Sequence, residues 1–345
     1  MATTQQQVAE LAGVTRATVS YVLGGRAEEL RITDAVAERV RRAARQLGYS
    51  PHHAARVLVS GKTMTLGLLL GDAAGHVAPF WSVMAEGVEA EALEAGYDVL
   101  LLRAHGEPTE TGLRSLRERR VDGLIALGQA AGAGADAWRD SPVPPVVIQA
   151  FGPPGLPSVG LDSRPGIDAA VAHLLELGHR RLMWIGPERG VGHRGTVLAA
   201  CAKARGLAAE ICDLGEVSEP FSRPDDQIGF WYETLGKALP DVMPATAVFC
   251  WNDRAALGLY ALFRQRGLRV PEDVSVIGFD DHEAALALPP LSTVSHEFRR
   301  MGAEASRLAM RLADGSVPRA EAAEATIRVP SRFVPRKSTG PAPSP

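Results

Sequence analysis

Three side chains near the start of the chain, Arg16, Ala17 and Tyr21, have the types and the spacing needed to read DNA bases. An Arg side chain can donate two hydrogen bonds to one guanine edge, and an Ala methyl group can pack on a thymine methyl group. Val19 and Val22 recur at helical spacing in the same segment, so the apolar and polar positions lie on opposite sides of one helix. The candidate DNA-contacting residues of this helix are Thr15, Arg16, Ala17, Thr18, Ser20 and Tyr21.

Another helix and a tight turn are predicted just ahead of this segment. Thr4 and Gln7 have the spacing of a capping box, and apolar residues then recur on one face, at Val8, Leu11 and Ala12. Gly13 can adopt the conformation of a sharp turn, and Thr15 can cap the helix that follows. Two short helices joined in this way form a helix-turn-helix, whose second helix lies in the major groove of DNA. The alternative is an ordinary helical hairpin with solvated charges.

A third helix and an excess of positive charge complete this head. Thr33 is placed to cap a helix with apolar positions at Val36, Val40, Ala43, Ala44 and Leu47. The other face of that helix carries Arg39, Arg41, Arg42 and Arg45. Residues 1–62 contain nine Lys and Arg against five Asp and Glu, a charge of +4, whereas the whole chain carries −3 and the remainder therefore −7. This asymmetry indicates a nucleic-acid-binding end on a neutral or acidic body.

The segments VAELAGVTRATVSYVL (8–23), LGYSP (47–51) and AARVLVSGKT (54–63) together resemble the LacI/GalR family of bacterial transcription regulators. The resemblance implies a DNA-binding domain at 1–49 and a hinge at 50–62 that becomes helical on operator DNA. In the hinge, Leu58 matches a Leu that wedges into the minor groove, and Ala55 matches a neighbouring groove contact. An apolar wedge of this kind kinks a base step. Without DNA the segment would be a plain linker.

The rest of the chain alternates apolar runs with amphipathic stretches. We expect strands at 66–70, 99–102, 123–127, 146–148, 182–185, 247–250 and 274–278. We expect helices at about 80–95, 109–119, 165–177, 194–205, 228–238 and 253–266. This order predicts βαβ units with parallel sheets, and the number of strands favours two doubly wound lobes with a ligand between them.

Further signatures of the same family follow in order: VGLDSRPG, HLLELGHRRLMWIGP, FCWNDRAALGL, GLRVPEDVSVIGFDD and PPLSTVSHEFRRMG. They imply an α/β body of two doubly wound lobes, similar to periplasmic sugar-binding proteins, at 63–336. Its chain would cross between the lobes three times. The N-terminal lobe would comprise about 64–161 and 291–322, and the C-terminal lobe about 162–290 and 323–336. The Pro- and Ser-rich tail, 337–345, is predicted to be disordered.

A sugar site needs polar side chains for hydroxyl groups and an aromatic face for the ring. Asn252 and Asp280 follow predicted strands, where parallel sheets place their ligands. The family resemblance assigns effector binding to Arg194, Asn252 and Asp280 and adds Phe298 as a pocket aromatic. Phe80 and Trp81 follow the first strand of the body and are further candidates. Asp253 is interpreted as a helix cap instead, while Trp251 and Phe221 are weaker candidates and Trp184 is expected to pack in the core.

Some residues depart from the family pattern. Val197 and Leu198 replace a Gly and an aromatic residue after the pocket Arg, which weakens the alignment of Arg194, and Gly24 and Gly25 replace an Asn-Gly pair. The segment 220–229 carries a small insertion. A competing hypothesis is a nicotinamide-dependent oxidoreductase, because Gly190, Gly192 and Gly195 form a G-x-G-x-x-G motif and Glu210 follows it. That hypothesis leaves residues 1–62 unexplained.

Composition sets the remaining expectations. No apolar run reaches the length of a membrane span and no signal peptide is evident, so we expect a cytoplasmic protein rather than a secreted solute-binding protein. Cys201, Cys212 and Cys250 fit neither a metal site nor a disulfide framework. We expect no enzyme activity, no cofactor and no metal. The sequence predicts a dimeric repressor that binds a pseudo-palindromic operator and responds to a small molecule, with a sugar as the family default and a purine or phosphosugar as alternatives.

Overall fold

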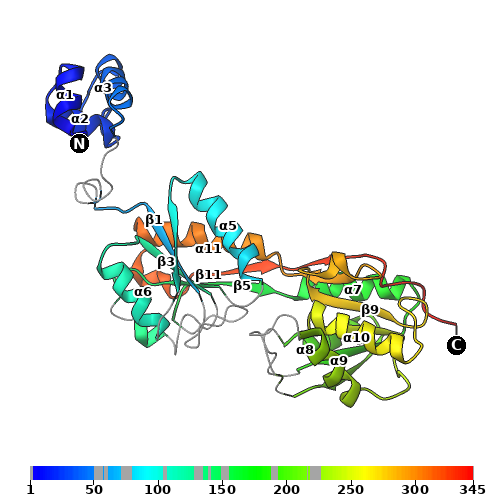
Figure 1. Ribbon diagram of the computed structural model, residues 1–345. Coiled ribbons are helices and arrows are strands. Elements are labelled where there is room, and N and C mark those ends of the chain that lie inside the picture. Colours follow the sequence, from blue (N-terminus) through cyan, green and yellow to red (C-terminus); the bar gives the residue numbers. More distant parts are fainter. Residues whose placement is uncertain are drawn as a thin grey trace. The chain divides into compact units, whose positions relative to one another are not determined.

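The computed structural model describes residues 3–49, 57, 61–70, 80–103, 107–127, 135–138, 141–148, 155–187, 193–215, 217 and 227–344. The chain divides into two compact units, Met1–Met64 and Thr65–Pro345 (Figure 1). The first unit contains three helices among its described residues: α1 (Gln5–Ala12), α2 (Arg16–Leu23) and α3 (Asp34–Gln46). These are the three helices that the apolar spacing predicts.

The ends of these helices are set by short-range hydrogen bonds. Thr4 and Gln7 form the predicted capping box, in which the backbone N–H of Thr4 donates to Oε1 of Gln7 at 2.9 Å. Gly13 ends α1 with a φ of 62°, a left-handed conformation that glycine adopts without a steric penalty. Thr15 caps α2 by accepting a hydrogen bond from the N–H of Thr18. Thr33 lies at the N-cap position of α3, but its side chain makes no capping bond.

The three helices enclose a small core that includes Val8, Val19, Val22 and Val40. The predicted inward position of Leu11 is wrong, because Leu11 is 47% exposed and Ala9 is buried beside Val8. The core therefore contains small residues where the helices approach one another. The head nevertheless has a buried centre of its own.

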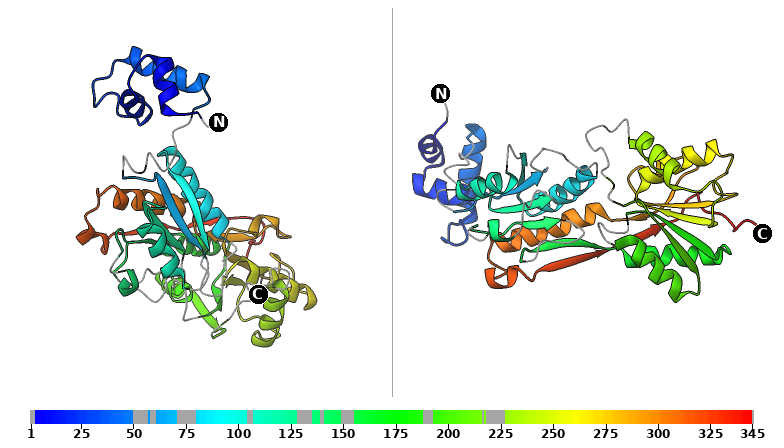
Figure 2. Two further views of the ribbon diagram at one scale, coloured as in Figure 1. Left: turned by 60° about the vertical axis from the view of Figure 1, so that its left-hand side comes forward. Right: turned by 90° about the horizontal axis from the view of Figure 1, so that it is seen from below.

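The second unit contains two six-stranded sheets with helices on both faces (Figures 1 and 2). The first sheet has the order β11-β5-β4-β3-β1-β2. Its strands are β1 (Thr65–Leu70), β2 (Asp98–Arg103), β3 (Gly123–Leu127), β4 (Val146–Ile148), β5 (Ser158–Asp162) and β11 (Thr326–Pro330). Its helices are α5 (Trp81–Glu94), α6 (Pro108–Arg117), α11 (Phe298–Ala313) and α12 (Arg319–Ala322), with a 3-10 turn at Ala135–Trp138. We call this assembly the first lobe.

The second sheet has the order β12-β10-β9-β8-β6-β7 and forms the second lobe. Its strands are β6 (Arg181–Gly186), β7 (Ala208–Asp213), β8 (Ala247–Cys250), β9 (Ser275–Asp280), β10 (Ser292–Ser295) and β12 (Arg332–Val334). Its helices are α7 (Arg164–Glu176), α8 (Arg194–Ala204), α9 (Gln227–Ala238) and α10 (Asp253–Gln265), with a 3-10 turn at Ala284–Leu286. The strand pairs of both sheets are parallel, except that β12 runs antiparallel to β10. Two doubly wound lobes are therefore confirmed.

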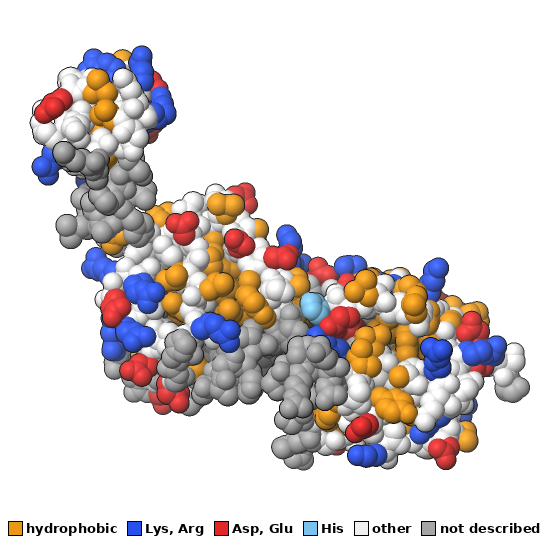
Figure 3. Space-filling view, viewed as in Figure 1, with side chains coloured by type: hydrophobic (Ala, Val, Ile, Leu, Met, Phe, Trp, Pro, Cys, Tyr) orange, Lys and Arg blue, Asp and Glu red, His pale blue; other side chains and the backbone are white. Residues whose placement is uncertain are grey.

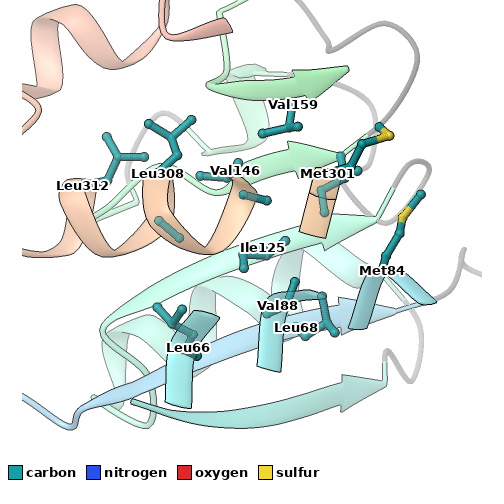
Figure 4. Close-up of a cluster of buried hydrophobic side chains, with 14 of the residues drawn as sticks. Leu66, Leu68, Met84, Val88, Ile125, Val146, Val159, Met301, Leu308 and Leu312 are labelled. Carbon is teal, nitrogen blue, oxygen red and sulfur yellow. The ribbon is translucent and has the colours of Figure 1, made fainter. Parts of the chain in front are cut away.

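Alternate residues of each strand pack on opposite faces of its sheet, as parallel sheets covered on both sides require. In the first lobe Leu66 and Leu68 face α5 and α11, whereas Leu69 lies in the cluster on the other face (Figure 4). The crossing of α5 and α11 is tight. A Cβ atom at Gly87 would collide with the backbone oxygen of Arg299, and one at Gly302 with that of Met84. Glycine at these positions lets the two helix backbones touch.

The chain crosses between the lobes three times, but two of the crossings lie later in the chain than predicted. β10 pairs with β9, so residues 291–295 belong to the second lobe and not to the first. β11 pairs with β5, so residues 326–330 belong to the first lobe and not to the second. The physical reason is backbone hydrogen bonding: β10 completes its pairing only in the second sheet, and β11 only in the first. The sequence signatures that placed the boundaries do not show this pairing. The side chain of Ser331, at the third crossing, accepts a hydrogen bond from the N–H of Gly166 at 3.0 Å.

The predicted disorder of residues 337–345 is wrong for the part that the structure describes. The N–H of Val276 in β9 donates to the backbone oxygen of Ser338, and Oγ of Ser338 donates to the backbone oxygen of Val276 at 2.6 Å. Oγ of Ser275 accepts the N–H of Gly340 at 3.1 Å. Pro and Ser predict disorder by composition, but here the Ser hydroxyl and the backbone pair with buried groups of the second lobe.

The described residues also bear on membrane spans, metal sites and cysteines. No helix among them has both the length and the apolar character required to cross a membrane. No group of three or more His, Cys, Asp or Glu side chains in the described ranges could hold a metal ion. Cys201, Cys212 and Cys250 are free thiols, and burial raises the pKa of each.

Candidate DNA-binding face and effector site

The second helix of the head, α2, presents the expected polar face. Arg16, Ala17 and Tyr21 are exposed, while Val19 and Val22 are buried in the head. Thr15 is exposed too, but its hydroxyl is engaged in capping, and Thr18 and Ser20 are half-buried. The expected hinge contacts, Ala55 and Leu58, lie outside the described residues. The arrangement leaves one long cationic side chain, one methyl group and one phenol ring available at this surface.

Tyr21 has a neighbour that sequence reasoning did not connect with it. The guanidinium of Arg26 lies over the Tyr21 ring, 5.8 Å from its centroid. Glu29 accepts two hydrogen bonds from Arg26, at 2.8 and 2.7 Å, and this pairing lowers the pKa of Glu29. A planar guanidinium held in this way can support an aromatic ring from one side.

Helix α3 adds positive charge to the head. Arg39, Arg41, Arg42 and Arg45 are all exposed, and Glu38 pairs with Arg45 at 2.6 Å. This hydrogen bond lowers the pKa of Glu38. Lys and Arg side chains gather along the upper and right-hand edges of the head in Figure 3. Exposed cations of this kind are suited to phosphate groups.

The second candidate site lies at the carboxyl ends of strands in the second lobe, and Arg194 is at its centre. Arg194 is the first residue of α8 and is only 6% exposed. Its guanidinium carbon lies 4.8 Å from the Trp251 ring centroid and 4.9 Å from that of Phe279. Nη1 donates a hydrogen bond to the backbone oxygen of Trp251 at 2.5 Å. Burial lowers the pKa of Arg194, and the two aromatic faces hold the cation in one plane.

Asp280, the last residue of β9, receives two groups at one oxygen. Its Oδ1 lies 3.9 Å from Nη2 of Arg194 and 3.2 Å from Nδ1 of His296. The backbone of Asp280 has a φ of 105°, which is rare for a residue with a Cβ and costs on the order of 1–3 kcal/mol. Strained backbone maintained by surrounding contacts is typical of functional sites.

The helix cap next to this site differs from the prediction. Asn252, and not Asp253, is the N-cap of α10, because Oδ1 of Asn252 accepts the N–H of Ala255 at 2.7 Å. Asp253 is instead almost fully buried, and its two oxygens accept hydrogen bonds from Thr293 Oγ1 and the N–H of His282. Burial, reinforced by the nearby charge of Asp280, raises the pKa of Asp253 to about 8. The spacing of Asn252 and Asp253 predicts a cap but does not decide which of the two residues forms it.

The candidate aromatic residues divide into two groups. Phe80 stacks on Phe298, with ring centroids 4.7 Å apart and planes 8° apart, and Phe298 contacts His296 edge to face at 5.0 Å. Trp81, in contrast, packs against the core of the first lobe. Trp184 is fully buried, as expected, and meets both Trp251 and Phe279 edge to face. Phe221 lies outside the described residues.

The structure therefore brings Arg194, Asp280, Phe298 and Phe80 into one chain of contacts. Sequence reasoning missed His296, which joins Asp280 to Phe298, and Phe279, one of the two aromatic faces around Arg194. The signal for His296 was its place directly after a strand, but that strand, β10, was not predicted. Phe279 directly precedes Asp280 in β9 and could have been found by the same rule.

An open cavity of about 200 Å³ adjoins this cluster. Ser295 and Glu297 line it together with Asp280 and Phe298, whereas His296, which lies between Ser295 and Glu297 in the chain, does not.

In the G-x-G-x-x-G motif, the glycine at position 195 is explained by packing. A Cβ atom at Gly195 would lie 2.9 Å from the ring of Trp184, so glycine lets α8 approach that ring. Gly190 and Gly192 lie outside the described residues. The start of α8 carries the buried Arg194, which is held by two aromatic rings.

The fold and these sites define a class of protein: a helix-turn-helix transcription regulator with a body like that of periplasmic binding proteins. Comparison with protein families agrees. Residues 4–52 match the family described as bacterial regulatory proteins, lacI family, and residues 171–339 match the periplasmic binding protein-like domain.

Similarity to known proteins extends over most of the chain. It is 31% identical over 307 residues to the HTH-type transcriptional repressor PurR of Haemophilus influenzae (strain PittEE), covering 88% of both chains. The lac repressor dimer bound to operator and the anti-inducer ONPF has the same fold, with a TM-score of 0.69 and 23% identity over 99% of this chain and 100% of that one. The complex of the transcriptional regulator CelR with cellobiose has a TM-score of 0.60 and 27% identity, covering 97% of this chain and 99% of that one. The chain belongs to the lacI family of bacterial regulatory proteins.

Proposed function

We propose that this regulator is a homodimeric repressor that binds a pseudo-palindromic operator and responds to a small molecule, with a sugar as the first candidate. The observation that carries the proposal is the exposed face of α2 on a compact, basic three-helix head. That face is presented by a helix whose other side is fully used in the core. A helix held in this way is suited to lie in a major groove.

On this proposal Arg16 and Ala17 read base edges, and Tyr21 makes an apolar or hydrogen-bonded contact next to them. Thr15, Thr18 and Ser20 complete the set, with hydroxyl groups suited to phosphate or base contacts. Ala55 and Leu58 are proposed as minor-groove contacts of the hinge, on the family resemblance. A dimer with two-fold symmetry would place two such heads on two half-sites of a two-fold operator.

The proposed effector site comprises Arg194, Asn252, Asp280 and Phe298, with Phe80 and Trp81 contributed from the first lobe. Charged groups next to flat aromatic faces are what a sugar requires, since its hydroxyls need hydrogen bonds and its C–H face packs on a ring. The similar regulator CelR forms a complex with cellobiose, which supports a sugar as the first candidate.

Effector and operator would be coupled through the relative arrangement of the two lobes. Asp280 and Phe298 flank the second crossing, which runs from β10 to α11. A ligand that contacts both sides of a crossing binds one arrangement better than another, and it can shift the equilibrium only by that difference in affinity. Whether it releases the operator or strengthens its binding follows from which arrangement it prefers.

The test begins with an operator selected from random duplexes by the full-length protein. We expect a two-fold symmetric site whose affinity falls steeply with salt, because bound cationic groups release counterions from DNA. Binding that is independent of salt, or a selected site without symmetry, would contradict the proposal.

The effector half of the proposal is tested with Asp280→Ala. The variant should keep operator affinity but lose the response to any compound that shifts the wild-type protein. Its melting temperature serves as the folding control. An unchanged response in the folded variant would refute the assignment of the effector site.

A further inference from the structure

We infer that His296 selects the effector: its Nε2 atom accepts a hydrogen bond from a hydroxyl or N–H group of an uncharged ligand. The inference rests on the proposed function, since it names the chemical class recognised at the proposed effector site. It concerns a residue that the sequence did not assign to that site. Three observations support it.

The first is the protonation of the imidazole. Burial, together with the positive charge of Arg194, holds the pKa of His296 well below its usual range, so the ring is neutral at physiological pH. A neutral imidazole carries one N–H. Nδ1 lies 3.2 Å from Oδ1 of Asp280, and a carboxylate oxygen can only accept a hydrogen bond. The proton is therefore on Nδ1, and Nε2 is left as an acceptor.

The second observation is that this acceptor is buried and lacks a partner. His296 is 5% exposed, and its Nε2 has no hydrogen-bond partner among the described residues. An unsatisfied buried polar atom costs about 1–3 kcal/mol, and native proteins rarely leave one without a ligand or water. Nε2 is therefore poised to accept a donor from outside the chain.

The third observation is a buried donor in the same cluster. The Nε–H group of Arg194 has no acceptor among the described residues either, although the rest of its guanidinium is engaged with Trp251 and Asp280. Arg194 and His296 converge on the same oxygen of Asp280 and both lie against Phe279. A hydroxyl group can both donate and accept, so a polyol carries the two kinds of group that these atoms lack.

The same arrangement disfavours an anionic group at Nε2 itself. The Asp280 carboxylate already faces the positive charge of Arg194, and the lone pair of Nε2 repels a phosphate or carboxylate oxygen. A phosphate group at Nε2 would meet an acceptor that cannot donate, so the group bound there is an uncharged hydroxyl or N–H. An uncharged sugar or other polyol fits the two unsatisfied atoms.

The experiment uses the full-length protein with two sets of probes. One contains ribose, glucose, cellobiose and related uncharged sugars and polyols, and the other contains ribose 5-phosphate, glucose 6-phosphate and gluconate. Titration calorimetry and tryptophan fluorescence report binding, and operator affinity is measured with each compound that binds. His296→Leu removes the acceptor, whereas His296→Gln keeps one, and His173→Gln at a half-buried His of α7 serves as the control.

We expect an uncharged compound to bind, with affinity reduced about 10- to 100-fold in His296→Leu and by much less in His296→Gln and His173→Gln. Binding of anionic compounds alone, or of no uncharged compound, would overturn the inference, as would full affinity in His296→Leu. If the bound compound is anionic but shifts operator affinity, only the inference fails. If an uncharged compound binds through His296 without altering operator affinity, the proposed function fails instead.

A second measurement does not depend on finding the ligand. Nitrogen NMR of the ¹⁵N-His-labelled wild-type protein distinguishes a protonated ring nitrogen from an unprotonated one. The His296 signals, assigned by their loss in His296→Gln, should show a proton on Nδ1 and none on Nε2 at neutral pH. A proton on Nε2 would overturn the inference.

Discussion

Replacing the buried carboxyl of Asp253 by an amide should change how the stability of the second lobe depends on pH. Asp253 is buried beside the half-buried Asp280 in the same site, and two neighbouring carboxylates are costly to ionise together. In the native protein Asp253 keeps its proton to a pKa of about 8, whereas in the unfolded chain the pKa returns to 3.8. Asp253→Asn removes this difference because the amide does not titrate.

The sign follows from which state holds the proton. Below pH 4 Asp253 is protonated in both states and contributes no pH dependence. Between pH 4 and 8 the unfolded chain loses the proton while the native state keeps it, so the free energy of unfolding falls as the pH rises. The pKa difference between 3.8 and about 8 corresponds to roughly 5–6 kcal/mol across the whole window. Above pH 8 both states are ionised and the effect is constant.

Urea unfolding at pH 5, 6, 7 and 8, followed by circular dichroism and tryptophan fluorescence, measures this directly. The difference in unfolding free energy between wild type and Asp253→Asn should change by about 1.4 kcal/mol per pH unit in favour of the variant. Asp273→Asn is the matched control. The hydrogen bonds from Arg269 lower the pKa of Asp273 to about 2, so that carboxyl is ionised in both states over this pH range.

Parallel stability profiles for wild type and Asp253→Asn would refute the reasoning. They would mean that Asp253 is ionised throughout, with the donors Thr293 and His282 outweighing its burial. In that case Asp280 would share its site with a second negative charge.

Three further predictions concern the head, the helix crossing and the tail. Arg16→Ala should lose discrimination at one operator base, worth about 1–3 kcal/mol, whereas Arg39→Ala should change the affinity for all sequences alike; equal profiles in a binding selection would contradict this. Gly87→Ala should destabilise the first lobe by about 3 kcal/mol or more in thermal unfolding, because its Cβ would meet the backbone of α11, while Gly236→Ala, with its nearest contact at 3.9 Å, should stabilise α9 by about 0.5–1 kcal/mol. Deleting residues 337–345 should lower the free energy of unfolding by at least about 4 kcal/mol, since four hydrogen bonds to the second lobe are lost at Ser338 and Gly340, at about 1 kcal/mol each. An unchanged urea midpoint would restore the expectation of a disordered tail.

The sequence predicted the elements of the body well where local pattern decides them. The helix expected at 194–205 is α8, and the strand expected at 247–250 is β8. Family membership and the two-lobed architecture are also confirmed. These features depend on apolar periodicity and on short motifs, both of which are local properties of the chain.

What the sequence did not predict depends on contacts between distant segments. β11 contains alternating polar residues and acquires its place only by pairing with β5, so its lobe could not be read from its own composition. The same is true of the tail, whose Ser338 is buried by residues 62 positions away. The site shows a similar limit: strand ends locate Asp280, but His296 enters through a pairing of β10 that no local pattern indicated. The roles of the candidate site residues stay predictions.

The order in which the sheets are completed has a consequence for the making of this protein. β11 and β12 are separated only by Ser331, and each forms an edge strand of a different sheet. While the chain is being synthesised, both lobes therefore lack a strand until the final segment emerges, and an open sheet edge can pair with other chains. The core of the head, in contrast, lies within the first fifty residues and is available early. A message that is cut short would thus yield a folded head on a body in which neither lobe can close, so ligand response is lost as a whole rather than by degrees.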